Sequence, residues 1–151
     1  MQHNTQKVDE LLCFSLYAAA NAMNRVYQPL LENLQLTYPQ YLVLVALWEK
    51  DGVSVSHVGS RIGLESNTLT PLLQRMEAAG LLRRSRSTQD ERQVIISLSA
   101  KGRQLQKKTK DIPSCILHAT GLSLSDAHQL RNKLSSLRTS LANDRDTADS
   151  S

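Results

Sequence analysis

The stretch VSHVGSRIGLESNTLTPLLQ, residues 55–74, decides the fold of this chain. Gly59 and Gly63 lie four residues apart, and apolar residues recur around them at the spacing of two short helices joined by a turn. A small residue at Gly59 lets the second helix approach the first, and Gly63 allows the turn a backbone conformation that is awkward for other residues. The apolar residues that would lock the two helices together are Val58, Ile62, Leu64, Leu69 and Leu72. The pattern predicts a helix-turn-helix whose first helix, 55–62, is capped by Ser54.

Residues 81–87 and 93–98, which follow this motif, predict the two strands of a β-ribbon with a polar loop between them. Asp90 and Arg92 are two residues apart in the loop, so they can pair and hold its shape while Arg92 reaches a minor groove. The arginines that flank the loop are Arg83, Arg84, Arg86 and Arg92. Motif and ribbon together predict a winged helix-turn-helix. The alternatives are a plain helical hairpin and a solvated ribbon with ordinary surface charge.

The second helix of the motif, about 67–79, would present polar side chains of the types that read base edges and bind phosphates. Pro71 lies inside this helix and removes one backbone donor, which opposes a regular helix there. The residues expected to bind double-stranded DNA are Ser66, Asn67, Thr68, Thr70, Gln74, Arg75, Arg84, Arg86, Asp90 and Arg92.

The remaining sequence predicts a mainly helical chain. Thr37 and Gln40 form a capping-box pattern at the start of an apolar helix over 38–50, which should be buried. Long helices are expected over 8–34, which Pro29 could kink, and over 100–112 and 123–142. Leu130, Leu134, Leu137 and Leu141 form a single apolar stripe on the last of them. Residues 143–151 are polar and are expected to be a disordered tail.

The composition fits one domain over residues 1–151, with 40% hydrophobic and 21% charged residues. The net charge is +4 and becomes more positive along the chain: −2 over 1–52, +2 over 53–98 and +4 over 99–151. All six aromatic residues lie in the first third, apart from most of the basic ones, which disfavours a base-stacking surface for single strands. Neither a signal peptide nor a membrane span is apparent, so we expect a cytoplasmic protein without membrane contact.

Cys13 has two possible roles. A free cysteine is most often a small buried hydrophobic residue. However, Tyr17 lies four residues on, and Tyr27, Tyr38 and Tyr41 follow; a phenol hydroxyl can donate to a thiolate and stabilise it. Tyr27 is 14 residues beyond Cys13, or about 21 Å along a continuous helix, so it could serve only the thiol of a second subunit.

The chain resembles the organic hydroperoxide resistance regulators of the MarR family from about Leu11 to Pro113. Two runs carry the resemblance: LCFSLYAAANAMNRVYQPLLENLQLTYPQYLVLVALWE, residues 12–49, and SNTLTPLLQRMEAAGLLRRSRSTQDERQVIISL, residues 66–98. The segments TYPQYLVL and DERQV are specific to this subgroup. A generic MarR protein would share the winged helix but would lack Cys13 and the tyrosines.

The resemblance implies a homodimeric repressor of MarR type, with the DNA-binding lobe at 38–98 and dimerisation through the helices at 8–34 and 100–142. Cys13 matches the family's peroxide-sensing cysteine, and Tyr27 and Tyr38 match the tyrosines that bond it from the partner; Tyr17 is a possible third. Cys115 resembles the second cysteine of members that resolve the sulfenic acid as an intersubunit disulfide; the alternative is a core cysteine, or a cysteine there by chance.

Two other functions are compatible with the same residues. A thiol peroxidase would use Cys13 catalytically and would have no use for a wing, so we do not expect an enzyme. A ligand-gated MarR repressor would bind a phenolic or drug-like effector in its dimer cleft, and its response would not depend on Cys13. We expect neither cofactor nor metal, because His3, His57, His118 and His128 are scattered and none has ligand spacing with a cysteine.

Overall fold

The computed structural model describes residues 6–149, which form two compact units, one ending at Ile112 and one beginning at Pro113. The first unit begins with a short 3-10 helix, η1 (Val8–Glu10), and a long helix, α1 (Leu12–Glu32). The single helix expected over 8–34 is therefore interrupted, because Leu11 has an extended backbone that separates the two. Pro29 lies within α1, which continues through it for three more residues. Within residues 6–149, no helix is long and apolar enough to cross a membrane.

Helix α2 (Tyr38–Glu49) forms the centre of the first unit. The predicted capping box is confirmed. The Gln40 backbone amide donates to Thr37 Oγ1 at 3.4 Å, and the Thr37 backbone amide donates to Gln40 Oε1 at 3.1 Å. Val43, Leu44 and Leu47 are almost completely buried, as an apolar helix of this kind requires. The helix is thereby held at its start by its own side chains and along its length by the core.

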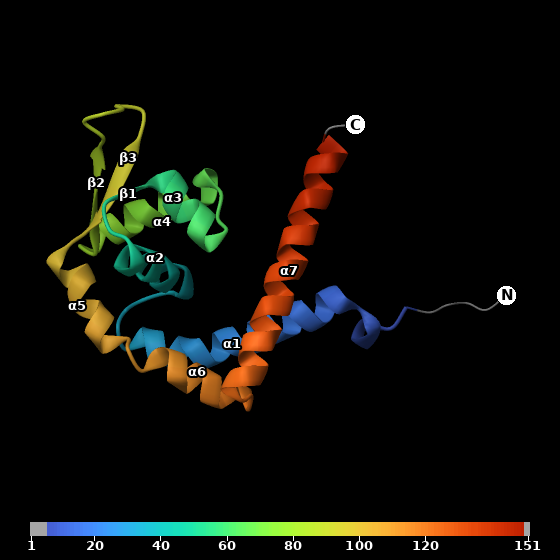
Figure 1. The fold of residues 1–151 in the computed structure, drawn as a ribbon. Helices are drawn as coiled ribbons and strands as arrows, with labels where there is room; N and C mark the ends of the chain where they lie inside the picture. The colour runs from blue at the N-terminus through green and yellow to red at the C-terminus, as the bar shows by residue number, and fades with distance from the viewer. Residues whose placement is uncertain (1–5, 150–151) are drawn as a thin grey trace. The chain divides into compact units, whose positions relative to one another are not determined.

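The helix-turn-helix is formed by α3 (Val55–Ile62) and α4 (Ser66–Ala78) (Figure 1). Gly63 has φ of 72°, the left-handed conformation that the turn was expected to need. A Cβ atom at Gly59 would lie 2.6 Å from the Leu64 carbonyl oxygen, so only glycine lets the turn come this close. Ser54 caps α3 by accepting from the His57 amide at 3.2 Å. All three sequence expectations for the motif are confirmed.

The wing is a three-stranded antiparallel sheet in the order β1-β3-β2, with β1 at Val53–Ser54, β2 at Leu82–Arg86 and β3 at Val94–Leu98. The expected ribbon is β2 and β3, paired from Leu82 with Leu98 to Arg86 with Val94. The strand β1 was not predicted, because two residues carry no alternation and pair with Ile95 and Ile96 only through the tertiary fold.

Three helices complete the chain: α5 (Ala100–Lys108), α6 (Ile112–Thr120) and α7 (Leu124–Asp149). The helix expected over 100–112 ends at Lys108, and α6 was not predicted at all. Proline is well tolerated in the first turn of a helix, so Pro113 allows α6 to begin there. The tail expected from residue 143 is helical as far as Asp149, because no proline or glycine interrupts α7.

Two long-range hydrogen bonds fasten α2 and the residues after it to the rest of the first unit. Trp48 Nε1 donates to the Gly102 carbonyl of α5 at 3.0 Å, and the Leu98 amide of β3 donates to Asp51 Oδ1 at 2.9 Å. A Cβ atom at Gly102 would lie 2.2 Å from the Leu81 carbonyl oxygen, so α5 packs directly on the turn before β2. The wing, α4 and α5 thus share one core.

Candidate functional site

One side of α4 is polar and accessible, and the other is buried. Leu69, Leu72, Leu73 and Met76 are buried against the first unit. Helical spacing then turns the remaining residues outward. The structure exposes all the α4 residues expected to contact DNA: Ser66, Asn67, Thr68, Thr70, Gln74 and Arg75. Pro71 is also exposed, and α4 extends past it to Ala78. The helix therefore continues past the proline and presents a mainly polar surface, to which Pro71 contributes an apolar ring.

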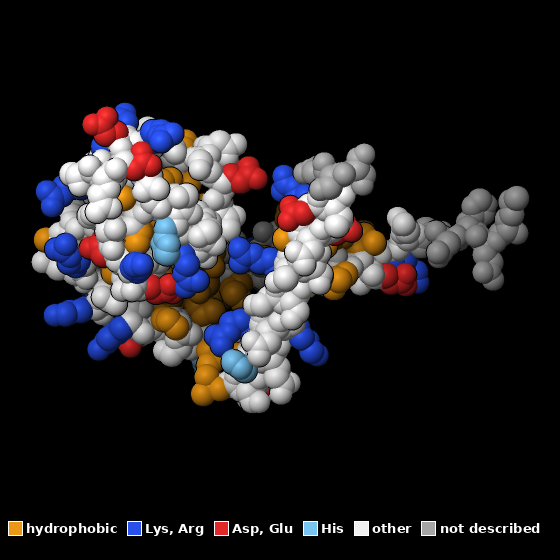
Figure 2. Space-filling view, turned by 45° about the horizontal axis from the view of Figure 1, so that its top comes forward, with side chains coloured by type: hydrophobic (Ala, Val, Ile, Leu, Met, Phe, Trp, Pro, Cys, Tyr) orange, Lys and Arg blue, Asp and Glu red, His pale blue; other side chains and the backbone are white. Residues whose placement is uncertain are grey.

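The wing tip carries three of the expected DNA-contacting residues in a defined arrangement. Asp90 Oδ1 accepts from the Arg92 amide at 3.1 Å and lies 3.5 Å from Arg92 Nε, so the pairing expected from the sequence is present. The Arg92 side chain is nevertheless 94% exposed. Arg86 is exposed and donates from Nη1 to the Glu91 carbonyl at 2.9 Å. Figure 2 shows Lys and Arg side chains spread over this lobe with acidic groups among them. The wing tip can thus present fixed positive charge to a polyanion.

Arg84 differs from the other wing arginines. Its guanidinium pairs with Glu77 of α4, with Arg84 Nη2 3.3 Å from Glu77 Oε1, and its side chain is only 29% exposed. The Arg84 backbone amide donates to Glu77 Oε2 at 2.7 Å. This bond, followed by those from the guanidinium, holds the pKa of the Glu77 carboxyl below its ordinary value. Sequence reasoning missed Glu77, although strand alternation places Arg84 on the same face as the buried Leu82 and could have indicated an inward partner.

The tyrosines expected to serve a thiol lie at the junction of α1 and α2. The Tyr27 and Tyr38 ring centroids are 4.8 Å apart, and those of Tyr27 and Tyr41 are 6.0 Å apart. Burial raises the pKa of Tyr27 to about 12, with further contributions from Tyr38 and Tyr41. Burial also raises the pKa of Tyr38. These phenols therefore stay protonated at neutral pH and remain able to donate hydrogen bonds.

A pocket of about 360 Å³ opens beside these two tyrosines. Its lining combines polar side chains of α1 with the start of α2: Asn24, Tyr27, Gln28, Leu31, Glu32, Leu36, Thr37 and Tyr38. Phenol and amide groups thus surround a partly apolar space that can admit a side chain or a small molecule.

Cys13 lies far from this pocket within its own chain. It is the second residue of α1, is exposed, and has the exposed Tyr17 one turn further on. Because α1 is one continuous helix, the 14 residues between Cys13 and Tyr27 correspond to about 21 Å. Tyr27 therefore cannot contact Cys13 of the same chain. Cys115 lies in α6 and is also an exposed free thiol.

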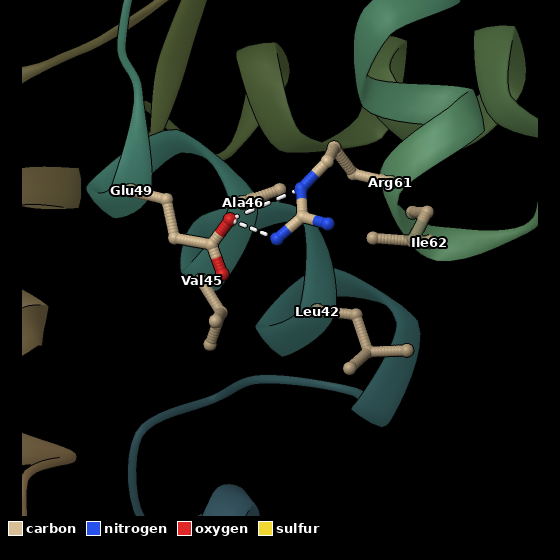
Figure 3. Close-up of a pocket in the computed structure, with 6 residues that line it drawn as sticks. All are labelled: Leu42, Val45, Ala46, Glu49, Arg61 and Ile62. Atoms are coloured by element: carbon tan, nitrogen blue, oxygen red, sulfur yellow. Dashed lines mark hydrogen bonds and ion pairs between the residues drawn. The ribbon is translucent and has the colours of Figure 1, made fainter. Parts of the chain in front are cut away.

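A second, smaller pocket of about 230 Å³ lies between α2 and α3 (Figure 3). Its apolar lining comes from Leu42, Val45, Ala46 and Ile62, and an ion pair between Glu49 and Arg61 stands at its edge. Arg61 Nε donates to Glu49 Oε2 at 3.1 Å. Sequence reasoning assigned no role to this pair, which ties the first helix of the motif to α2.

Histidine takes no part in a metal centre in residues 6–149, where no group of three or more His, Cys, Asp or Glu side chains could hold an ion. His3 lies outside the described residues. His57 is half-buried in α3, whereas His118 and His128 are exposed in α6 and α7.

Comparison with known proteins identifies the family. The sequence model for the SarA/Rot transcriptional regulators matches residues 25–109, more than half of the chain. The chain belongs to the SarA/Rot family of transcriptional regulators. The match covers the last eight residues of α1, all of α2, the whole helix-turn-helix and wing, and α5.

Relatives of this SarA/Rot regulator confirm its resemblance to the organic hydroperoxide resistance regulators. The organic hydroperoxide resistance transcriptional regulator of Bacillus subtilis is 47% identical over 131 residues, covering 87% of this chain and 89% of the relative. The HTH-type transcriptional regulator TtmR of Methylorubrum extorquens is 50% identical over 136 residues, covering 90% of this chain and 70% of TtmR.

Solved structures agree in fold. Reduced AbfR bound to DNA superposes with a TM-score of 0.74 at 34% identity, covering 87% of this chain and 91% of AbfR. Disulfide-formed AbfR superposes with a TM-score of 0.64 at 36% identity, covering 83% and 88%. The mainly helical winged-helix fold expected from the sequence is therefore confirmed.

Proposed function

We propose that this SarA/Rot regulator is a cytoplasmic, dimeric, peroxide-sensing repressor whose reduced form binds operator DNA. One observation carries the proposal. Cys13 lies in the first turn of the continuous helix α1 and Tyr27 lies 14 residues further along it, against Tyr38 of α2, so a thiol served by those tyrosines requires a second chain. The hydroperoxide-resistance relative and the reduced, DNA-bound AbfR support the same function.

Exposed apolar side chains support a dimer formed through the terminal helices. Such residues cluster on the first half of α1 and along α7, where a soluble monomer would leave them in water. They include Leu12, Phe14, Leu16 and Tyr17 on α1, and Leu124, Leu130, Leu134 and Leu141 on α7. Two chains related by a twofold axis bury the same surfaces reciprocally and bring two recognition helices to two half-sites.

The polar side of α4 would read a major groove, and the wing tip would reach the adjacent minor groove. Gln74 and Arg75 carry donors suited to base edges and phosphates. Asp90 holds the tip while Arg92 remains exposed. The paired half-sites make affinity depend on the distance between the two α4 helices.

Peroxide chemistry at Cys13 would start from the thiolate. The partner's phenols would donate hydrogen bonds to this thiolate. The sulfur attacks the outer oxygen of an organic hydroperoxide; an S–O bond forms, the O–O bond breaks, and the alkoxide takes a proton and leaves as the alcohol. Sulfur loses two electrons and becomes the sulfenic acid.

Cys115 would resolve this intermediate across the dimer. Its thiolate attacks the Cys13 sulfenic sulfur of the other chain, forms an S–S bond and displaces hydroxide, which leaves as water. Both thiols are exposed and unpaired, as such a reaction requires. The new bond would pull on α1 and α6, change the spacing of the recognition helices and release the DNA.

The test uses the full chain and a pool of random-sequence duplexes from which the reduced protein selects its site. We expect stoichiometric cumene hydroperoxide to abolish binding of the wild type to the selected duplex, and to leave Cys13→Ser bound. A non-reducing gel should show a dimer band that is missing in Cys115→Ser.

Three other results would contradict the proposal. Loss of binding in both wild type and Cys13→Ser would contradict a switch at this thiol. Binding that peroxide leaves intact would favour the ligand-gated repressor. A reduced protein that selects no duplex but consumes peroxide catalytically with a reductant would favour the thiol peroxidase.

A further inference from the structure

Arg84 faces the interior side of the wing. In the β2–β3 ladder it pairs with Ile96, which is completely buried, so the two side chains share the core-facing side of the sheet. Arg83, one residue earlier, lies on the opposite face and is exposed. Arg86, nearer the hairpin loop, is also exposed. Arg86 lies on the same side of the strand as Arg84, but its guanidinium bonds to the Glu91 carbonyl of the loop, and of these three arginines only Arg84 pairs with a residue of α4.

Glu77 of α4 meets Arg84 with both carboxylate oxygens. Glu77 Oε2 accepts from the Arg84 backbone amide at 2.7 Å, and Glu77 Oε1 accepts from Nε and Nη2, each at 3.3 Å. The carboxylate therefore fixes the main chain of β2 as well as the guanidinium. Because Glu77 lies in the last turn of α4, the contact joins the end of the recognition helix to the middle of strand β2.

We propose that the Glu77–Arg84 pair is a positioning device for DNA binding, which holds the wing at a set orientation to α4 so that both reach their grooves together. Arg84 acts through Glu77 and does not contact phosphate. The inference rests on the proposed DNA-binding function and deepens it. It also replaces the sequence-based expectation that Arg84 is a DNA contact.

Two physical arguments favour positioning over a phosphate contact. An arginine whose charge is already matched by a carboxylate releases few counterions when DNA binds, so it adds little to the salt dependence of affinity. A phosphate contact would also require Arg84 to leave Glu77, exposing a carboxylate beside a polyanion. By contrast, a fixed wing makes its groove contact effectively intramolecular once α4 is seated.

The first experiment is the salt dependence of binding by the reduced full chain to the duplex it selects, between about 50 and 200 mM salt. Arg84→Gln should weaken binding by about 3- to 30-fold at every salt concentration and leave the slope of log Kobs against log salt unchanged. Arg86→Gln is the matched control from the same strand. The slope of log Kobs against log salt for this variant should become less steep by about 0.9.

Glu77→Gln should change DNA affinity in opposite directions under a pure charge effect and under positioning. The amide oxygen still accepts from the Arg84 backbone amide, so the fold should be retained, as thermal unfolding would verify. Removal of a negative charge near DNA should strengthen binding if only charge matters. Positioning predicts weaker binding at every salt concentration instead, because the guanidinium loses its partner.

Two results would overturn the proposal: a slope for Arg84→Gln that falls as much as that of Arg86→Gln, or tighter binding by Glu77→Gln than by the wild type. A wild type that binds no duplex would refute the proposed DNA-binding function itself, and this is seen before any variant is compared.

Discussion

Gly59 determines how closely the two helices of the motif approach. A methyl group there would lie 2.6 Å from the Leu64 carbonyl oxygen, and backbone atoms cannot yield as a flexible side chain can. Gly59→Ala should lower the free energy of unfolding by about 1–3 kcal/mol. Ser60→Ala, at an exposed position of the same helix, is the control and should change it by less than about 0.5 kcal/mol. Equal effects in urea denaturation would contradict the close approach.

Gln35 has a left-handed backbone, with φ of 56°, just beyond the end of α1. The Leu36 amide bonds back to the Leu31 carbonyl at 3.1 Å, the pattern of a helix C-terminus that usually contains glycine. Gln35→Gly should therefore raise stability by up to about 1 kcal/mol. Asn33→Gly is the matched control, since Asn33 is right-handed helical and glycine should destabilise there. Thermal unfolding of the two variants should show shifts of opposite sign.

The contact between α1 and α2 should make stability sensitive to alkaline pH. Burial raises the pKa of Tyr27 to about 12, whereas an unfolded tyrosine titrates near 10. The folded chain thus keeps this proton where the unfolded chain has lost it, so stability should fall as pH rises from about 10 to 12. Tyr27→Phe should reduce that fall in denaturation measured at pH 9 and pH 11. An unchanged fall in Tyr27→Phe would contradict the burial of this phenol as its cause.

At the scale of the whole molecule, the apolar stripe of α7 predicts association. Leu134 is 40% exposed in one chain and belongs to the stripe with Leu130 and Leu141. Leu134→Glu should produce monomers in sedimentation and weaken binding to a two-half-site duplex by about 100-fold or more, because the second half-site is no longer tethered. Asn132→Glu, on the opposite side of the helix, adds the same charge and should stay dimeric. A monomeric wild type would contradict the dimer outright.

Local chemistry was sufficient to predict much of this protein from its sequence. Three features depend on interactions within a few residues, so a short segment of sequence is enough to predict them. They are the capping box at Thr37, the left-handed turn at Gly63 and the polar side of α4. The family followed from motifs of the same kind, and the comparisons bear it out.

Several features could not be predicted from the sequence because they depend on residues that are distant in the chain. The strand β1 exists only because β3 pairs with it, and the Trp48–Gly102 bond joins residues 54 positions apart. The inward turn of Arg84 depends on which face of the wing the core covers, which the arginine cluster alone does not reveal. Short-range propensity therefore determined α2, the helix-turn-helix and its polar surface, but not α6 or the full length of α7. Tertiary packing alone decided which charged groups face α4 and which face solvent, because burial depends on the neighbours that folding brings together.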